Sequence, residues 1–153
     1  MYSGTRQYKK YINLQDDVLE GSEEYGWFGF YMASGNVSLD TYSDLMISSF
    51  PYADRTKRGS SYILYGRESF GKLAEDGTTR MPFNVTFDNA DYGFIGGRGD
   101  SFLGADLGIG DFNMDGKNDF VIGAPGIGIQ KASDPGELYF YYKGALPNRM
   151  PLM

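Results

Sequence analysis

Apolar and aromatic residues occur along the chain in short runs that glycine, proline and Asx residues interrupt. No long segment repeats its apolar positions every 3.6 residues, as an amphipathic helix would. The clearest runs cover residues 45–50, 59–65, 120–122 and 138–142. Short apolar runs between turn residues are typical of buried β-strands. The abundance of glycine (22 residues) and of aromatic residues (16%) agrees with this pattern, so we predict an all-β fold.

Polar residues are most regularly spaced in the loop that starts at Asp111. Oxygen-bearing side chains occupy its positions 1, 3, 5 and 9, and Gly116 at position 6 permits the left-handed turn that brings them together. Carboxylates packed this closely repel one another unless a cation lies among them, and calcium prefers such oxygen ligands. We therefore predict a calcium site. Its ligands are Asp111, Asn113, Asp115, the backbone carbonyl of Lys117, and Asp119.

The residues after the loop distinguish between two kinds of calcium motif. An EF-hand requires a bidentate Glu at position 12, where this chain has Ile122. A short apolar run closed by turn residues comes after Asp119 instead, which indicates a strand on each side of the loop. The stretch Gly-Asp-Phe-Asn-Met-Asp-Gly-Lys-Asn-Asp, with Ile-Gly-Ala-Pro after it, resembles the FG-GAP repeat, the blade unit of integrin-α-type β-propellers. An acidic hairpin without metal is the alternative.

A second copy of the pattern lies upstream at a constant distance, since 111 − 36, 115 − 40 and 119 − 44 all give 75. Residues 59–65 match residues 136–142 with a further shift of two. Such self-similarity indicates a repeat architecture. The upstream loop has fewer carboxylates, and Thr41 replaces glycine at position 6, where a left-handed backbone is strained for a β-branched residue. We predict a weak or lost second metal loop, formed by Asn36, Ser38, Asp40 and Asp44.

The resemblance implies two β-propeller-type blades in this chain. Because propellers usually close with about 4–8 blades, we expect completion by strand exchange with other copies or by a longer propeller. Residues 8–14 resemble the segment after the third strand of a blade, and residues 139–144 resemble a third strand, so the last blade lacks its fourth. Trp27, which leads the first predicted strand, is expected in the blade core. The predicted organisation is a lead-in strand completing a neighbouring blade (1–24), a first FG-GAP-like repeat (25–66), a linking strand segment (67–98), a second FG-GAP repeat with the calcium loop (99–144) and a C-terminal tail (145–153).

Charge and residue types narrow the partners and the chemistry. The chain has 14 basic and 20 acidic residues, a net charge of −6, which argues against a nucleic-acid partner. No run approaches 18 apolar residues, so we predict no membrane span. The chain has neither His nor Cys, the commonest general base and the most nucleophilic side chain. We therefore do not predict an enzyme, and carboxylate-based action on polysaccharide is the remaining catalytic alternative.

Several short signals concern the surroundings of the protein. The N-terminus has no apolar core that could act as a signal peptide, whereas the resemblance implies an extracellular or cell-surface location. Glycosylation sequons begin at Asn84 and Asn36. Asn36 is also position 1 of the upstream loop, where a glycan and a metal ion exclude each other, so we favour Asn84. Residues 98–100 spell the integrin-ligand tripeptide Arg-Gly-Asp, but their place before a strand indicates a turn.

The resemblance implies two functions. One is a calcium-stabilised extracellular module that recognises protein or glycan and serves adhesion. The alternative is a structural subunit of an extracellular filament, ring or sheath, assembled head to tail by strand donation. In that case the partners are other copies of the chain or the rest of a propeller. An unpaired apolar edge at residues 138–142 would otherwise favour aggregation.

Overall fold

The computed structural model describes residues 18–22, 26–49, 58–71, 75, 83–97, 101–126 and 136–142. In these residues every regular element is a strand and none is a helix, which confirms the all-β prediction. No helix of the described part is long and apolar enough to cross a membrane. The strands are β1 (Leu19–Gly21), β2 (Phe28–Gly35), β3 (Asp44–Ser49), β4 (Ser60–Leu64), β5 (Phe83–Val85), β6 (Tyr92–Ile95), β7 (Asp106–Gly110), β8 (Asp119–Ala124) and β9 (Glu137–Tyr141).

The chain divides into two compact units, and the smaller one comprises residues 1–20 and 67–84. Its described part is a short two-stranded pairing of β1 with β5, in which the Phe83 N–H donates to the Val18 carbonyl at 2.7 Å. Phe70 contacts Phe83 with ring centroids 6.0 Å apart, and the Arg67 guanidinium lies 4.9 Å from the centre of the Phe70 ring. In the described part of this unit, aromatic contacts accompany the strand pairing.

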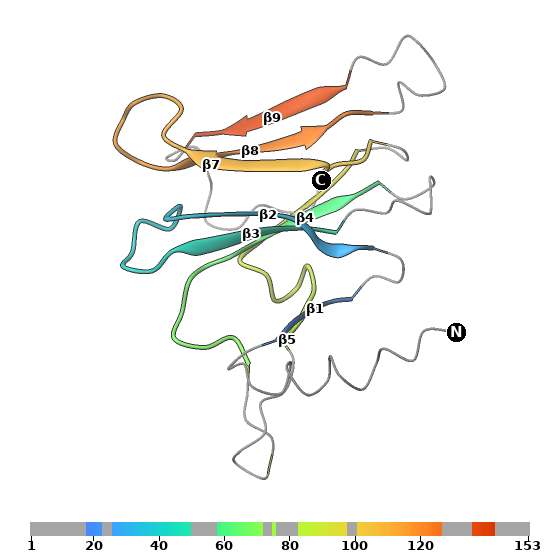
Figure 1. Ribbon diagram of the computed structural model, residues 1–153, viewed down its shortest axis with the longest axis vertical. Helices are drawn as coiled ribbons and strands as arrows, with labels where there is room; N and C mark the ends of the chain where they lie inside the picture. The colour runs from blue at the N-terminus through green and yellow to red at the C-terminus, as the bar shows by residue number, and fades with distance from the viewer. Residues whose placement is uncertain are drawn as a thin grey trace, which may run out of the picture. The chain divides into compact units, whose positions relative to one another are not determined.

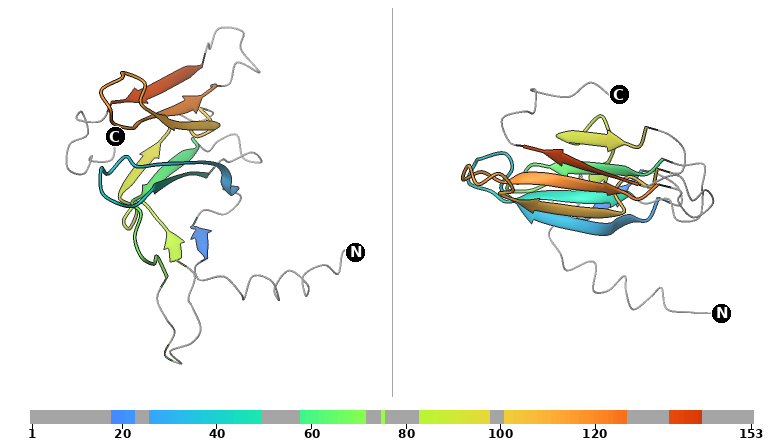
Figure 2. Two further views of the ribbon diagram at one scale, coloured as in Figure 1. Left: turned by 60° about the vertical axis from the view of Figure 1, so that its left-hand side comes forward. Right: turned by 90° about the horizontal axis from the view of Figure 1, so that it is seen from above.

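The larger unit, residues 21–66 and 85–153, contains two antiparallel sheets (Figure 1). The first sheet has the strand order β2-β3-β4-β6, and the second sheet has the order β7-β8-β9. Both are meanders in which each chain-adjacent pair is hydrogen-bonded, except that β6 joins β4 after an intervening segment. Strand β2 contacts β7, so the sheets lie in layers, as Figure 1 and the left view of Figure 2 show.

The two sheets are copies of each other in register. Strands β3 and β8 have the same length and start 75 residues apart, since 119 − 44 = 75, and their pairing with β2 and β7 aligns Gly35 with Asp44 and Gly110 with Asp119. Strands β4 and β9 start 77 residues apart, since 137 − 60 = 77. The same offsets relate the residues with positive φ: Trp27 with Phe102, Gly29 with Gly104, Leu39 with Met114, and Gly59 with Gly136. Backbone geometry thus repeats even where the side chains have diverged.

The hydrophobic core lies between the two sheets. The first sheet contributes Val37, Met46, Ile63 and Phe94, and the second contributes Leu103, Phe120, Ile122 and Ala124. The Phe94 ring on β6 contacts both Phe120 and Tyr141, with centroids 5.5 and 5.1 Å apart. Gly35 allows the sheets to approach, because a Cβ there would lie 2.5 Å from the Ile109 Cγ2 methyl.

Two details of the sequence interpretation are wrong. Trp27 is not in the core: its side chain is 44% exposed, because the residue precedes β2 and its ring packs beside that of Phe30 at 5.3 Å. Thr41 is not left-handed, since the first loop makes its left-handed turn at Leu39 (φ 66°) instead. The lead-in segment 8–14, the tripeptide at 98–100 and the tail at 145–153 lie outside the described residues.

Candidate calcium site

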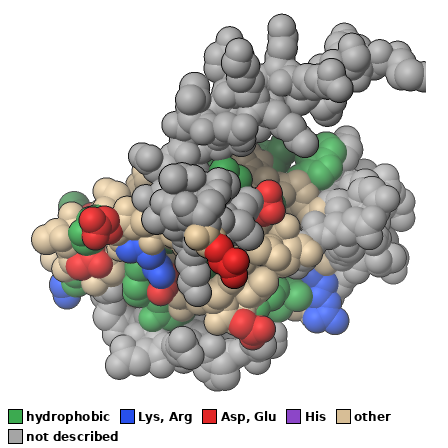
Figure 3. Space-filling model, turned by 90° about the horizontal axis from the view of Figure 1, so that it is seen from below, with side chains coloured by type: hydrophobic (Ala, Val, Ile, Leu, Met, Phe, Trp, Pro, Cys, Tyr) green, Lys and Arg blue, Asp and Glu red, His purple; other side chains and the backbone are tan. Residues whose placement is uncertain are grey.

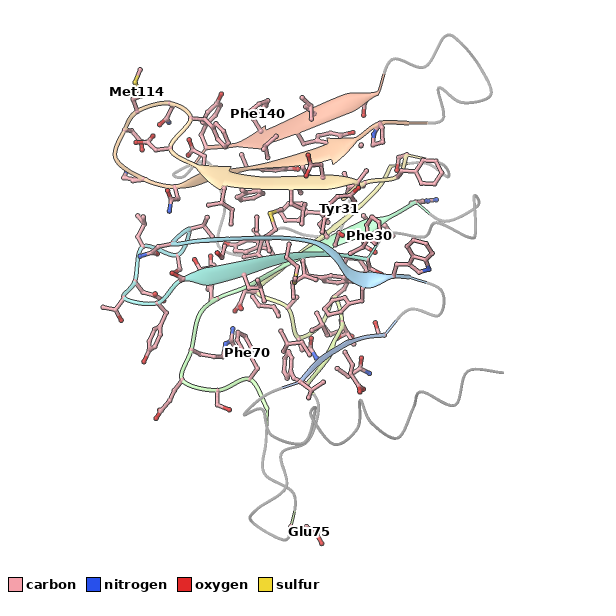
Figure 4. The ribbon with its side chains drawn as sticks, viewed as in Figure 1. Phe30, Tyr31, Phe70, Glu75, Met114 and Phe140 are labelled. Carbon is pink, nitrogen blue, oxygen red and sulfur yellow. The ribbon has the colours of Figure 1, made fainter. Side chains whose placement is uncertain are left out.

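The predicted calcium loop joins β7 to β8 of the second sheet. It begins at Asp111, directly after β7, and ends at Asp119, the first residue of β8. Gly116 has φ 83°, and a Cβ there would meet nothing within 4 Å, so glycine is needed for its backbone conformation rather than for space. The tip of the loop is fully accessible, and Figure 4 shows Met114 pointing away from the strands there.

Shared hydrogen bonds draw the side chains at positions 1, 3 and 5 together. The Asp115 N–H donates to Asp111 Oδ1 and to Asn113 Oδ1, each at 3.0 Å. The second oxygen of Asp111 accepts from the Gly116 N–H at 2.8 Å, and Asp115 Oδ1 accepts from the Lys117 N–H at 2.9 Å. Because one nitrogen is within hydrogen-bonding distance of both oxygens, the first two predicted ligands converge on one side of the loop.

Asp119, the ligand predicted at position 9, is placed differently. Its side chain is 1% exposed, and one of its oxygens accepts from the Phe112 N–H at 3.1 Å. A buried carboxylate needs such partners, since leaving it without hydrogen bonds would be costly. Asp119 therefore ties position 2 of the loop to the start of β8 through this oxygen.

These residues can be compared with what calcium requires. In the described part of the chain, no three or more Asp, Glu, His or Cys side chains gather closely enough to hold a metal ion. Two of the predicted ligands are not of these four side-chain types, because they are the Asn113 amide oxygen and the Lys117 backbone carbonyl. The donors are all oxygens, and the left-handed glycine supplies the curl, so the loop fits calcium in chemistry and in backbone. The ligand set, with Asp119 at position 9, stays a prediction.

The upstream loop, between β2 and β3, fills its interior with its own hydrogen bonds. Asn36 Oδ1 accepts from the Leu39 N–H at 2.7 Å, and the Asn36 amide nitrogen donates to the Asp40 carbonyl. Asp40 Oδ1 accepts from the Tyr42 N–H at 2.7 Å. Ser38 Oγ donates to Asp44 Oδ1 at 3.2 Å. The oxygens of the downstream loop accept similar backbone hydrogen bonds, so the weak or lost metal site stays a prediction that rests on the smaller number of carboxylates upstream.

Asp44 is the centre of this upstream loop, a role that the sequence pattern did not predict. It is 1% exposed, and its Oδ2 accepts from the Val37 N–H at 2.7 Å and the Ser38 N–H at 2.6 Å. Its Oδ1 accepts from the Gly66 N–H at 2.9 Å, beyond the end of β4. The sequence could have indicated this role through the position of Asp44. An acid at the first residue of a buried strand needs hydrogen bonds from neighbouring backbone groups.

The two glycosylation sequons differ in their accessibility. Asn84 is exposed in β5, whereas the Asn36 amide nitrogen already donates within its loop. Glycan attachment at Asn36 would remove a proton from the nitrogen that makes this contact. The preference for Asn84 stays a prediction, and the geometry of Asn36 favours it.

Comparison with known proteins identifies the second sheet. A family model described as FG-GAP repeat matches residues 103–141, which cover β7, the loop, β8 and β9. The chain contains an FG-GAP repeat. The resemblance seen in the sequence is thereby confirmed, and the matching register of the first sheet marks it as a second, diverged copy.

Longer proteins contain regions similar to this chain. The phosphatidylinositol-glycan-specific phospholipase D of Rattus norvegicus is 27% identical over 93% of the chain, and that of Bos taurus is 26% identical over 93%. Integrin alpha pat-2 of Caenorhabditis elegans is 29% identical over 68%. The chain spans 16% of the length of each phospholipase and 8% of the integrin. So small a share of an enzyme does not establish enzymatic activity here.

Proposed function

We propose that this chain is a calcium-stabilised, extracellular propeller-type module that recognises protein or glycan. The observation that carries the proposal is the loop 111–119 within an FG-GAP repeat, with its converging oxygen side chains and left-handed Gly116. Bound calcium would supply a fixed positive charge that holds these oxygens together. The chain's own residues would then present a rigid hairpin between β7 and β8.

The extracellular and recognition parts of the proposal rest on the relatives and on the surface. FG-GAP repeats are typical of extracellular proteins, and one relative is an integrin alpha chain. Millimolar calcium outside cells suits modules whose Kd is about 10⁻⁴–10⁻³ M. On the face that Figure 3 shows, the Lys and Arg side chains of the described residues form separate small groups and no stripe. That distribution suits protein or glycan better than nucleic acid.

Exposed aromatic side chains offer a surface for such recognition. Trp27 and Phe30 are each about half exposed, and the Phe30 ring meets Tyr31 edge-on at 4.7 Å. Figure 4 shows Phe30 and Tyr31 beside β2. Aromatic faces of this kind stack on sugar rings and on apolar side chains alike. We expect a glycan array to give hits that Trp27→Ala removes; hits unchanged by that substitution would place recognition elsewhere.

Calcium binding is tested by thermal unfolding of the full chain with about 2 mM calcium and with chelator. For a Kd of about 10⁻⁴ M, bound calcium should stabilise the fold by about 2 kcal/mol through RT ln(1 + [Ca]/Kd). Asp115→Ala should abolish that gain. Asp40→Ala, the same position in the upstream loop, should keep it and is the matched control. Equal gains in the parent and in Asp115→Ala would show that calcium acts at another site.

The open edge of β9 favours a second candidate function, that of a structural subunit. In the first sheet, β6 pairs with β4, whereas in the described part of the second sheet no strand pairs with the equivalent edge of β9. Exposed edges accept strands from other chains. Light scattering in calcium and after chelation would reveal a mass several times 17.0 kDa if copies assemble through such strands. A stable monomer at all concentrations would leave the recognition module as the better account.

A further inference from the structure

One peptide bond in the predicted calcium loop has a sequence that isomerises readily in proteins. Asp-Gly occurs twice in the chain, at residues 115–116 in this loop and at 76–77, outside the described residues. The backbone nitrogen that follows an aspartate can attack the side-chain carboxyl carbon, and glycine leaves this nitrogen unshielded because it has no Cβ. Asp115 and Gly116 are both exposed, so water reaches the peptide between them.

The folded loop turns the Asp115 carboxyl group toward this peptide. Asp115 Oδ1 accepts from the Lys117 N–H at 2.9 Å, so the side chain lies along the chain in the direction of Gly116. An aspartate that bonds to the backbone two residues further on forms a local turn of its own. Such a turn shortens the path from the Asp115 carboxyl carbon to the Gly116 nitrogen.

A second carboxylate contacts the nitrogen that has to lose its proton. Asp111 Oδ2 accepts from the Gly116 N–H at 2.8 Å. A general base has to lie within about 2.6–3.2 Å of the atom that carries the proton, and this contact meets that requirement. Asp115 therefore supplies the carbon that is attacked, and Asp111 supplies a base for the attacking nitrogen.

We propose that Asp115 is a site of isoaspartate formation, that Asp111 assists the reaction, and that bound calcium suppresses it. The Gly116 nitrogen forms a bond to the Asp115 carboxyl carbon, and the bond from this carbon to one of its oxygens breaks. That oxygen leaves as water, with the proton of the nitrogen, passed on by Asp111, and one proton from solvent. The resulting succinimide takes up one water. Opening at the side-chain carbonyl restores Asp115, whereas opening at the main-chain carbonyl gives isoaspartate, and nothing is oxidised or reduced.

Isoaspartate would change the loop lastingly. The backbone then runs through the former side chain of Asp115 and gains a methylene carbon, and the free carboxylate is attached directly to Cα. The regular spacing of the predicted ligands from Asp111 to Asp119 is thereby lost. A chain modified in this way should no longer gain stability from calcium at this loop.

The calcium dependence rests on the proposed function. The predicted ligands include Asp111 and Asp115, so a bound ion would engage both the carboxylate that takes the proton and the carboxylate that is attacked. Only the calcium-free fraction of the chain then reacts. About 2 mM calcium and a Kd of about 10⁻⁴ M predict a rate about twentyfold lower than in chelator.

The upstream loop has the same turn without the other two features. Asp40 Oδ1 accepts from the Tyr42 N–H at 2.7 Å, the same kind of contact as in the downstream loop. Thr41 follows Asp40, and its β-branched side chain shields the nitrogen that would attack. Asn36, at the position of Asp111, offers an amide and not a carboxylate. Asp40 is therefore a matched reference within the chain that should stay unmodified.

The test incubates the full chain at neutral pH with calcium and with chelator. Peptide mapping by mass spectrometry, together with enzymatic methylation of isoaspartyl groups, follows the modification at each site. In chelator, isoaspartate should accumulate at residue 115 and not at Asp40. About 2 mM calcium should slow this accumulation about twentyfold. Residues 76–77 lie outside the loop, so calcium should leave their rate unchanged.

Two comparisons separate the folded loop from the Asp-Gly sequence alone. Asp111→Asn should slow the reaction severalfold in chelator, whereas Asp106→Asn, which removes an exposed charge at the start of β7, should not. Isoaspartate at residue 115 should also form faster in the folded chain in chelator than in the chain unfolded in urea. The reason is that unfolding removes the contacts of Asp111 and Asp115.

Isoaspartate that forms no faster at residue 115 than at Asp40 would overturn the proposal. So would equal rates in the folded chain and in urea, because the loop geometry would then contribute nothing. Equal rates in calcium and in chelator would overturn the calcium control. If calcium still stabilised the parent chain but not Asp115→Ala in that case, the proposed function would remain; if it stabilised neither, the proposed function would fail as well.

Discussion

Ser61 lies where the two sheets of the larger unit pack against each other. Its side chain is 0% exposed on β4, and its hydroxyl finds no hydrogen-bond partner among the described residues. A Cβ on Gly104 of the second sheet would lie 2.6 Å from that hydroxyl, so the two residues touch across the interface. A buried hydroxyl without a hydrogen bond lowers stability. The close approach of Gly104 explains why residue 61 has a small side chain, but it does not require a hydroxyl.

Ser61→Ala should therefore leave stability unchanged or raise it by up to about 1 kcal/mol, because an unsatisfied polar atom is removed. The matched control is Ser49→Ala, since the equally buried Ser49 hydroxyl donates to the Gly26 carbonyl at 2.9 Å. That control should lower the free energy of unfolding by about 1 kcal/mol. Urea denaturation measures both changes. A loss of stability in Ser61→Ala as large as in the control would reveal a hydrogen bond for Ser61.

Gly35 gives a second prediction about the same interface. Gly35→Ala should cost about 1–3 kcal/mol of unfolding free energy, because the new methyl lies 2.5 Å from Ile109 Cγ2 and 3.2 Å from Asn118 Nδ2. Gly110→Ala should stay within about 0.5 kcal/mol of the parent chain. Thermal unfolding of the two variants compares them directly. Equal losses would mean that strand propensity, and not sheet packing, determines the cost.

At the scale of elements, the two loops hold the same hairpin by different means. Both have a left-handed residue at position 4, Leu39 in one and Met114 in the other, and both begin their second strand with a buried Asp. The upstream loop adds hydrogen bonds from Asn36 and Ser38 that close it without a cation. The downstream loop keeps three carboxylates and a left-handed glycine. Under the proposed function, closing this loop depends on a bound cation.

Asp44→Asn should therefore destabilise the chain by about 3 kcal/mol, whether calcium is present or absent. The reason is that an amide keeps only one acceptor oxygen, so its NH2 group must face either the N–H donors of Val37 and Ser38 or that of Gly66. Urea denaturation with calcium and with chelator gives the comparison. Asp40→Asn, on the exposed side of the loop, should cost less than about 1 kcal/mol. A loss at Asp44 that appears only in chelator would instead assign a metal ion to the upstream loop.

For the whole molecule, two partly buried tyrosines predict that stability falls at alkaline pH. Burial raises the pKa of Tyr141, and burial together with the neighbouring Tyr92, Asp44 and Asp91 raises the pKa of Tyr65. A raised pKa in the folded state means stability that is complete below the unfolded pKa of about 10. That stability is lost as the pH rises above this value, because the unfolded chain then releases protons that the folded chain retains.

We accordingly expect the urea midpoint to fall between about pH 9 and pH 11. Tyr141→Phe should reduce the fall, whereas Tyr42→Phe, at a half-exposed tyrosine outside the core, should leave it unchanged. A fall of the same size in all three proteins would assign the alkaline sensitivity to other groups.

How much of the molecule was predictable depends on whether a feature is local. The strand class, the 75-residue spacing and the loop between β7 and β8 are apparent from spacing and turn residues that the sequence displays directly. The exposure of Trp27 was not apparent, because the sequence does not mark that β2 begins only at the next residue, Phe28. The role of Asp44 was missed for a similar reason. Its partner Gly66 lies 22 residues further along, and contacts at that distance are created by the folded sheet.

The residue at position 2 of each loop donates its backbone N–H to the buried Asp that starts the next strand, and its side chain packs on other residues. Val37 occupies it upstream, held by Asp44 and buried in the core, and Phe112 occupies it downstream, held by Asp119 and packed on Phe140. Anything that fixes the backbone of a loop must therefore also fix the side-chain contacts of its position 2. With the proposed calcium role, the contact of Phe112 with Phe140 would depend on the ion concentration around the chain, whereas the packing of Val37 would not.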